Sequence, residues 1–216
     1  MRKFKYLWVL FWILSCNSKD KEANTTESVS NSTERKVLLD DSLGGFTLFI
    51  PDRYDTMFSW VHRSDCGAPC NTRKIRFQST SLPIHKESGF IWTDFTDSID
   101  RLTISYPEEV RIRTKAPELG QIEFGHSTNV IQLKSDYPEF TLKSDTIRLI
   151  NNKYYSFVVL EEEKNTKRKI VYASLDILGN EIKFCYEVAK GAVNDSVYVD
   201  FVKNAETLLS TIKTEK

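Results

Sequence analysis

The segment Lys153–Glu162, KYYSFVVLEE, decides the fold because it opens a series of three runs rich in β-branched and aromatic residues. The polar stretch EKNTKR joins it to Lys169–Ile177, KIVYASLDI, and a turn through Leu178–Glu181 leads into Ile182–Ala189, IKFCYEVA. Runs of this composition separated by tight polar joints are typical of strands that pair with their neighbours along the chain. The sequence therefore predicts an antiparallel β-meander in the last third of the protein.

Shorter segments before the meander alternate apolar and polar residues, which is the pattern of a half-buried strand. In Gly44–Pro51, GGFTLFIP, the side chains of Phe46, Leu48 and Ile50 share one face, and a proline ends the run. We expect further strands at Thr72–Ser79, Arg101–Pro107 and Phe140–Ile150, and short strands at GQIEFG (Gly120–Gly125) and NVIQL (Asn129–Leu133).

The C-terminal region changes from the period of a strand to that of a helix. Its apolar residues recur at helical spacing in Val197, Phe201, Ala205, Leu208 and Ile212. Asp195 or Ser196 is well placed to cap this helix by accepting a bond from its first free amide groups. We therefore predict an α+β fold of one domain, in which an antiparallel β-meander is packed by a C-terminal amphipathic helix.

The order of these elements resembles the PsbP/Mog1-type fold, an α/β/α architecture. The resemblance rests on the strand GFTLFIP at the front, the meander behind it and the closing helix VYVDFVKNAETLLSTIK. Members of that fold bind partners or assist assemblies in very different settings. The resemblance therefore implies an accessory or binding module, and it names no ligand because a fold does not specify a function.

The N-terminus carries the pattern of an export signal. Arg2, Lys3 and Lys5 precede Tyr6–Leu14, an uncharged run too short to cross a bilayer, which needs about 20 apolar residues. The following Ile13–Cys16, ILSC, resembles the lipobox of bacterial lipoproteins. That resemblance implies cleavage after residue 15 and a diacylglycerol on the sulfur of Cys16, which would hold the protein on a membrane.

A polar segment separates this anchor from the folded body. Residues 16–35 contain no aromatic and almost no aliphatic side chain, so we expect a flexible tether there and a single globular domain over 36–216. The patch Lys19–Glu22, KDKE, resembles the charged export tags of Bacteroidota lipoproteins. It implies a place in the cell envelope, lipid-anchored at the outer membrane on its periplasmic or surface face.

Cys66 and Cys70 frame the sequence CGAPC. Nearby cysteines of an exported chain usually join, so we expect a disulfide between them. Free thiols and a metal site are the alternatives, since His62, Cys66 and Cys70 are spaced by four residues. A metal would need a fourth ligand, for which Asp65 and His85 are the candidates.

Other side chains that could carry chemistry have simpler interpretations. Cys185 lies in a predicted strand and is expected to be a buried, inert thiol. His62, His85 and His126 are scattered through the sequence, which favours loop or surface positions. Trp60 and Trp92 could line a binding face, but packing in the core is the favoured interpretation.

One short pattern is repeated. Aspartate followed by Ser or Thr and then an apolar residue occurs five times, with the hydroxyl groups of Ser42, Thr56, Ser98, Thr146 and Ser196. It is similar to the O-glycosylation sequon of exported Bacteroidota proteins, which implies that these hydroxyls are sugar acceptors. Asp-Ser and Asp-Thr pairs are also common in turns and caps, so both interpretations stay open.

Composition and motifs narrow the function. Basic and acidic residues are equal in number, 30 each, so the chain lacks the basic excess of a nucleic-acid-binding protein. It also lacks the G-x-S-x-G and H-E-x-x-H motifs and a phosphate-binding glycine loop. We expect a non-enzymatic binding or accessory module without a cofactor, tethered to the membrane and acting on a ligand or another envelope protein. The alternative is a metal- or thiol-dependent envelope enzyme centred on His62, Cys66 and Cys70.

Overall fold

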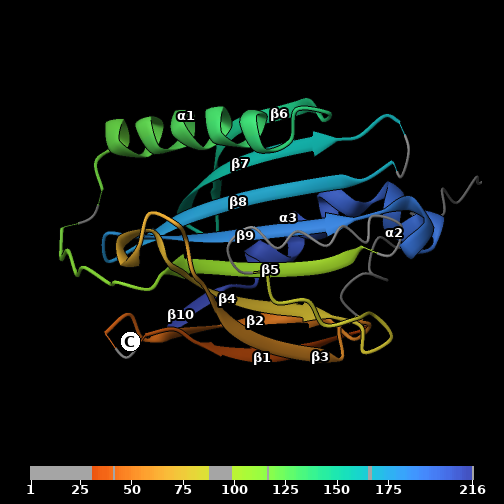
Figure 1. The fold of residues 1–216 in the computed structure, drawn as a ribbon, viewed down its shortest axis with the longest axis horizontal. Coiled ribbons are helices and arrows are strands. Elements are labelled where there is room, and N and C mark those ends of the chain that lie inside the picture. The colour runs from red at the N-terminus through yellow and green to blue at the C-terminus, as the bar shows by residue number, and fades with distance from the viewer. Residues whose placement is uncertain (1–30, 41, 88–98, 116, 165–166, 216) are drawn as a thin grey trace, which may run out of the picture.

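The computed structural model describes residues 31–40, 42–87, 99–115, 117–164 and 167–215 (Figure 1). Its largest element is a seven-stranded sheet in the order β3-β4-β5-β9-β8-β7-β6, and every neighbouring pair is antiparallel. The strands are β3 (Thr56–His62), β4 (Thr72–Gln78), β5 (Asp100–Pro107), β6 (Thr141–Ile150), β7 (Lys153–Glu161), β8 (Lys169–Ile177) and β9 (Asn180–Val188). The antiparallel, α+β character expected from the sequence is confirmed.

The predicted meander is β7, β8 and β9, with β6 added on the outer side. Polar and glycine turns connect these strands, and positive φ angles occur at Asn151, Asn152, Leu178 and Gly179. Register across the meander is continuous, so that Ser156 of β7 lies opposite Ser174 of β8. Successive side chains along each strand point to opposite faces of the sheet, so alternate residues share one face.

A second, three-stranded sheet in the order β1-β2-β10 is drawn at the bottom of Figure 1, where it overlaps β3 and β4 of the large sheet. It consists of β1 (Ser32–Leu38), β2 (Gly45–Pro51) and β10 (Lys213–Glu215). β1 begins four residues before the expected start of the domain at position 36, so Ser32–Arg35 belong to a strand and not to the tether. These polar residues fit a strand because β1 is an edge strand whose side chains are mostly exposed.

The C-terminal helix is in two pieces, α2 (Asp195–Val199) and α3 (Phe201–Ser210), which meet at Asp200. The N-cap is one residue earlier than expected, because the side chain of Asn194 accepts a bond from the amide of Val197 at 2.9 Å. The buried side chains of α3 include Phe201, whose ring stacks on that of Tyr186 at 4.6 Å between centroids.

Helix α1 (Leu119–Asp136) replaces the two short strands predicted at Gly120–Gly125 and Asn129–Leu133, which are wrong. The helix starts where the amide of Glu118 donates to the side chain of Gln121 at 3.0 Å. Only Asn129 and Leu133 of α1 are buried, so the apolar residues do not mark one continuous helical face. Over these short segments, apolar and polar residues alternate as they do in a strand, which is why strands were predicted there. Figure 1 shows α1 running along β7 at the top of the molecule.

The hydrophobic core occupies both faces of the large sheet. On one face, residues of the meander and β5 join those of β2 and α3; the largest fully buried members are Tyr54, Phe46, Tyr155, Phe77, Phe157, Phe184 and Phe201. On the other face, a smaller cluster under α1 joins Leu133 to Val158, Leu160, Ile170 and Tyr172. The sheet is therefore covered by α1 on one side and by α3 with the small sheet on the other.

Two short 3-10 helices, η1 (Ala68–Cys70) and η3 (Lys190–Ala192), complete the described elements. In the described part of the chain, no helix is long and apolar enough to cross a bilayer.

Candidate ligand-binding cleft

A cleft of about 1090 Å³ opens between α1, the start of β7 and the turn that joins β8 to β9. Its walls also include the turn before β2, around Leu43, and the end of the chain at Thr214 and Glu215. Segments more than 170 residues apart therefore contribute to a single concave surface. This volume is slightly above the range of about 300–1,000 Å³ that is usual for small-molecule sites.

Polar side chains from α1 and three strands form the floor of the cleft. The ring nitrogen Nδ1 of His126 and the hydroxyl of Ser156 share a hydrogen bond of 2.9 Å. The side-chain amide of Asn129 donates both to Ser174, at 3.1 Å, and to the carboxylate of Glu181, at 2.6 Å. Ser156, Ser174 and Asn129 are nearly inaccessible, with exposed fractions of 5%, 5% and 7%.

The floor is supported from below by Tyr172. Its hydroxyl donates to the side-chain oxygen of Asn129 at 3.4 Å. Burial raises the pKa of Tyr172, and the nearby charge of Glu181 raises it further, so the phenol keeps its proton and stays a donor. The amide of Asn129 therefore has partners on both its nitrogen and its oxygen, and its orientation is fixed.

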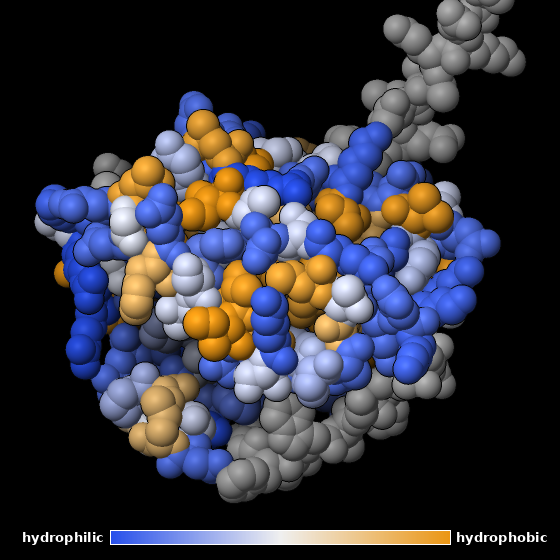
Figure 2. Space-filling view, turned by 90° about the horizontal axis from the view of Figure 1, so that it is seen from above, coloured by the Kyte–Doolittle hydropathy of each residue, from blue (hydrophilic) through white to orange (hydrophobic). Residues whose placement is uncertain are grey.

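The rim of the cleft is apolar and exposed. Phe124 of α1, Tyr154 at the start of β7 and Leu178 in the β8–β9 turn all line the cleft, although they are 76%, 50% and 41% exposed. Figure 2, which views the molecule from the α1 side, shows apolar side chains gathered between polar ones in the middle of this face. Exposed apolar groups of three separate elements around one opening are typical of a binding surface.

The position of Leu178 depends on an unusual turn. Leu178 has φ 53° and Gly179 has φ 82°, and a bulky residue rarely adopts the first of these values. The amide of Arg113 donates to the carbonyl of Leu178 at 2.7 Å, which fixes the turn against the segment before α1. A Cβ atom on Gly179 would lie only 2.6 Å from Cβ of Arg113, so glycine is required there.

The Ser156–His126 pair supplies hydrogen bonds without the surroundings of an activated nucleophile. Ser156 lies within β7, between β6 and β8, and it pairs with residues of both neighbours. Backbone amides of a central strand are used in the sheet ladder, so they are not available as an oxyanion hole beside this hydroxyl. The floor therefore presents polar side chains that can form hydrogen bonds with a bound molecule.

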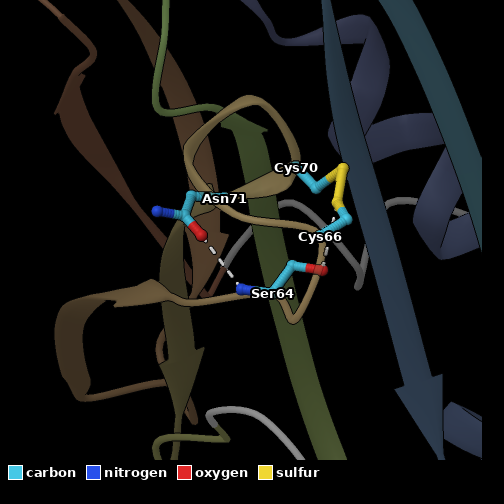
Figure 3. The surroundings of a disulfide bond; sticks show 4 residues. All are labelled: Ser64, Cys66, Cys70 and Asn71. Carbon is cyan, nitrogen blue, oxygen red and sulfur yellow. Dashed lines mark hydrogen bonds between the residues drawn. A yellow bond between two sulfur atoms is a disulfide. The ribbon is translucent and has the colours of Figure 1, made fainter.

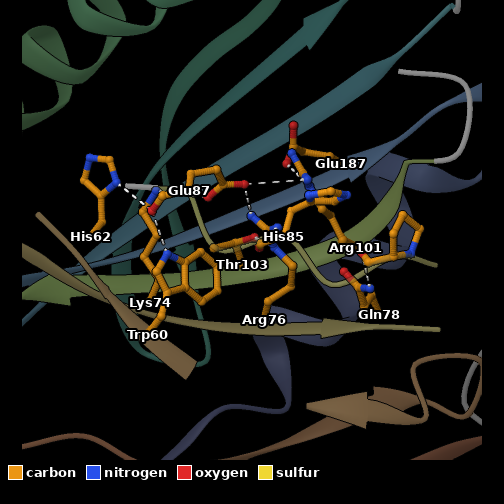
Figure 4. Close-up of polar contacts among 11 residues, drawn as sticks. Trp60, His62, Lys74, Arg76, Gln78, His85, Glu87, Arg101, Thr103 and Glu187 are labelled. Atoms are coloured by element: carbon orange, nitrogen blue, oxygen red, sulfur yellow. Dashed lines mark hydrogen bonds and ion pairs between the residues drawn. The ribbon is translucent and has the colours of Figure 1, made fainter. Parts of the chain in front are cut away.

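A second polar group, which we call the Glu87 cluster, covers the same face of the sheet over β4, β5 and β9 (Figure 4). The carboxylate of Glu87 accepts from Arg76 at 2.7 Å, and Arg101 donates to Glu187 at 2.7 Å. Lys74 lies 3.5 Å from the second oxygen of Glu87. The side chains of Arg76 and Glu187 are only 3% and 5% exposed, so this is a largely buried network.

Electrostatics within the Glu87 cluster favour the charged carboxylates. Burial alone would raise the pKa of Glu187, but the charge and hydrogen bond of Arg101 outweigh it and hold that pKa below its ordinary value. The same balance, with Arg76 as the main cation, lowers the pKa of Glu87. Because its charges are already paired with one another, we interpret the cluster as structural.

Two residues considered from the sequence contact the main chain of this cluster. The indole nitrogen of Trp60 donates to the carbonyl of Glu87 at 3.0 Å, and Nδ1 of His62 lies 3.1 Å from the same oxygen. Trp60 is half-buried and its ring stacks on that of Phe58, so it packs on the sheet surface and not in either core cluster. Trp92 lies outside the described residues.

Cys66 and Cys70 lie at disulfide distance in an exposed loop (Figure 3). Their Cα atoms are 5.9 Å apart, which is normal for a disulfide. The loop is held by Ser64, whose amide donates to the side chain of Asn71 at 2.9 Å and whose hydroxyl reaches the sulfur of Cys66 at 3.5 Å. Among the residues that the structure describes, no group of three or more His, Cys, Asp or Glu could hold a metal ion.

The remaining residues singled out in the sequence are dispersed. Ser42, Thr146 and Ser196 are exposed and Thr56 is half-buried, whereas Cys16 and Ser98 lie outside the described residues. The hydroxyl of Ser42 donates to Asp40 at 2.7 Å, and that of Ser196 donates to Asn194 at 2.8 Å, as turn and cap residues do.

The sequence predicts a buried thiol at Cys185, but the residue is only half-buried on β9; burial nevertheless raises the pKa of its thiol. The carbonyl of His85 accepts from Arg76 at 3.2 Å. His126 was expected on a loop or at the surface, but it lies on α1 and its ring faces the floor of the cleft. No motif marks it, because its partner Ser156 is 30 positions away.

Comparison with known proteins shows a shared fold. Neither the family models nor the curated proteins contain a match to this chain. Among solved structures, the chain is similar to cyanobacterial PsbP (CyanoP) from Synechocystis sp. PCC 6803, with a TM-score of 0.51 and 10% identity, covering 85% of this chain and 93% of that one. A protein of unknown function from Pseudomonas aeruginosa, PA94, a putative regulator, has a TM-score of 0.37 and 8% identity over 85% of this chain and 98% of its own.

At 10% identity, the likeness to CyanoP concerns the fold alone. It supports the PsbP-like part of the resemblance expected from the sequence.

Proposed function

We propose that this protein is a lipid-anchored, non-enzymatic binding module of the bacterial cell envelope, and that its ligand occupies the cleft beneath α1. The observation that carries the proposal is the construction of the cleft. Five polar side chains from four elements converge on its floor, and apolar side chains of three elements surround its opening. Pockets that combine apolar surface with a few convergent polar groups are the usual sites of ligand binding.

The anchor part of the proposal rests on the sequence. A lipidated Cys16 would leave residues 17–31 between the membrane and β1, and a flexible chain of that length has an end-to-end distance of about 20 Å. The folded body would then lie close to the bilayer, at the outer membrane of a Bacteroidota-type envelope. Another envelope protein is the natural second partner of such a module.

Two modifications belong to the same proposal. We propose a disulfide between Cys66 and Cys70, because an exported chain meets an oxidising environment. We also propose O-glycosylation at one or more of the Asp-Ser/Thr positions, which is supported by the exposure of Ser42, Thr146 and Ser196. Intact-mass measurement of the protein purified from its own cells tests both, and a mass explained by lipid alone would contradict the sugar.

Thiol titration distinguishes this proposal from an enzyme that uses free thiols. In a chain beginning at Asn17, unfolded without reductant, a closed Cys66–Cys70 bond leaves one titratable thiol, that of Cys185. A count of three would instead favour the enzyme centred on His62, Cys66 and Cys70.

The cleft itself is tested by what the protein carries. The anchored protein is purified from solubilised envelopes, denatured and extracted, and the small molecules released are identified by mass spectrometry. The variant Phe124→Asp places a charge on the rim. Ile131→Asp places it about two turns further along the same face of α1, at a position that does not line the cleft and has similar exposure (76% and 71%). We expect a molecule that accompanies the wild type and Ile131→Asp but not Phe124→Asp. Equal recovery from both variants would contradict binding in the cleft.

A further inference from the structure

We infer that the cleft takes an amphipathic ligand head first, with an uncharged hydrogen-bonding head on the floor and an apolar body against the rim. This inference rests on the proposed function, since it specifies the ligand class of the same cleft. It follows from the distribution of polar and apolar groups with depth, and from the pairing of the charges in the walls.

The buried part of the cleft is polar and its exposed part is apolar. Ser156 and Ser174 are almost fully buried at the floor, whereas Phe124 and Tyr154 are at least half exposed at the rim. A purely apolar ligand would desolvate the hydroxyls of the floor without replacing their hydrogen bonds, which costs free energy. A ligand that inserts its polar end satisfies the floor and leaves its apolar part where the apolar side chains are.

The floor offers both donors and acceptors. A serine hydroxyl can donate one bond and accept others, so Ser156 and Ser174 keep capacity beyond their bonds to His126 and Asn129. Both carboxylate oxygens of Glu181 accept hydrogen bonds as well. A head that carries hydroxyl or amide groups, which also donate and accept, matches this mixture.

The acidic groups in the walls already have partners. Glu181 accepts from Asn129 at 2.6 Å and its other oxygen lies 3.4 Å from Lys183. Glu215 forms an ion pair with Lys36 at 2.5 Å. Asp176 accepts from the backbone amide of Gly179 at 2.8 Å.

Two basic groups line the walls outside the floor, the exposed Arg113 and the half-buried Lys153. The amine of Lys153 donates to Thr214 at 3.4 Å. Arg113 is exposed, so water and salt screen its charge. The floor therefore holds no unmatched charge among the described residues, and a charged head would lose its hydration there without gaining a counter-ion.

Three ligands with the same eight-carbon chain test the head preference: octyl glucoside (uncharged), octylammonium and octanoate. The protein is the chain from Asn17 to Lys216, which keeps every residue of the two core clusters, since they lie between Val37 and Ile212. Dissociation constants are measured by calorimetry at pH 7, below the concentrations at which the ligands form micelles. We expect octyl glucoside to bind about tenfold more tightly than either charged ligand.

Matched variants locate the binding. Phe124→Ala removes a rim contact and Ser156→Ala removes a floor hydroxyl, so each should weaken octyl glucoside about fivefold. Ile131→Ala and Ser127→Ala change exposed residues of α1 that do not line the cleft, and neither should alter the affinity.

The outcomes distinguish failure of the head preference from failure of the binding cleft. If all three ligands bind equally well and Phe124→Ala weakens each of them, the cleft binds ligands but the preference for an uncharged head is refuted. If none of them binds, or if Phe124→Ala and Ile131→Ala behave alike, the binding cleft itself is refuted together with the head preference.

Discussion

Replacing Glu187 with glutamine tests the physical account of the Glu87 cluster. The wild-type carboxylate is 5% exposed and accepts from Arg101 at 2.7 Å. Opposite charges about 4 Å apart at an effective dielectric constant near 20 attract by about 4 kcal/mol. The glutamine oxygen can still accept one bond, and Glu87 lies 3.9 Å from the same arginine, which replaces part of the lost attraction. We therefore expect Glu187→Gln to lower the free energy of unfolding by about 2 to 3 kcal/mol at pH 7, somewhat below the usual cost of breaking a buried pair.

The loss should depend on pH in a defined direction. The folded-state pKa of Glu187 is lowered from the ordinary value of 4.5, so its carboxylate contributes fully above pH 4.5 and its contribution disappears as the pH falls through the folded-state pKa. Glutamine does not titrate. The difference in unfolding free energy between wild type and variant should therefore be constant from pH 7 to about 5.5 and should shrink below pH 4.5.

Urea unfolding followed by tryptophan fluorescence and circular dichroism measures this difference at each pH. Glu163→Gln is the matched control, because Glu163 pairs with Lys143 at 2.8 Å but is 63% exposed, and its removal should leave the urea midpoint unchanged. The reasoning is refuted if Glu187→Gln costs no more than the control, or if its cost does not diminish in acid.

Three further predictions concern the turn at Gly179, the core residue Phe201 and the thiol of Cys185. Gly179→Ala should destabilise the protein by about 1 to 2 kcal/mol, because φ is +82° and the new Cβ would meet Arg113; urea midpoints measure this, and no loss would contradict the turn geometry. Phe201→Ala should cost about 3 to 5 kcal/mol, since the ring is fully buried, while Val199→Ala, at a position 70% exposed, should cost less than about 0.5 kcal/mol in the same assay. Cys185 should not react with a thiol reagent at pH 8 until the protein unfolds, because burial raises its pKa; rapid labelling of the native chain would show an accessible thiolate.

Most strands were predictable because their apolar side chains, which face the core, alternate with polar side chains on the opposite face of the sheet. β7, β8 and β9 match the predicted runs to within a residue or two, and β2, β4 and β5 also lie where alternation placed them. A strand's pattern is local, so it can be recognised without knowledge of its partners. β1 and β3 were not predicted as strands, because as edge strands they bury few side chains and their alternation is weak.

Helix α1 was missed for the opposite reason. It buries Asn129 and Leu133 but exposes Phe124 and Ile131, so hydrophobicity does not identify its inner face. Its buried face is held against the sheet partly by polar contacts, the hydrogen bonds of Asn129 to Ser174 and Glu181. Sequence patterns that equate burial with apolar residues cannot detect a helix of this kind.

The cleft could not be read from the sequence, because topology creates it. His126 and Ser156 belong to different elements, and they meet because α1 runs along β7 in the folded domain. Each residue on its own has an ordinary interpretation as a loop or strand residue. The sequence signal that was available, Phe124 among the polar residues of its segment, was interpreted as part of a strand.

The three-stranded sheet determines how the domain would bear load. Ser32, where the chain enters, pairs with Pro51 at one end of β2, and Glu215 pairs with Gly45 at the other end, about 20 Å away. β1 and β10 are both antiparallel to β2, so they run in the same direction on either side of it. Tension applied between the two ends of the body therefore pulls along these strands and strains their hydrogen bonds together, in shear, instead of opening them one at a time.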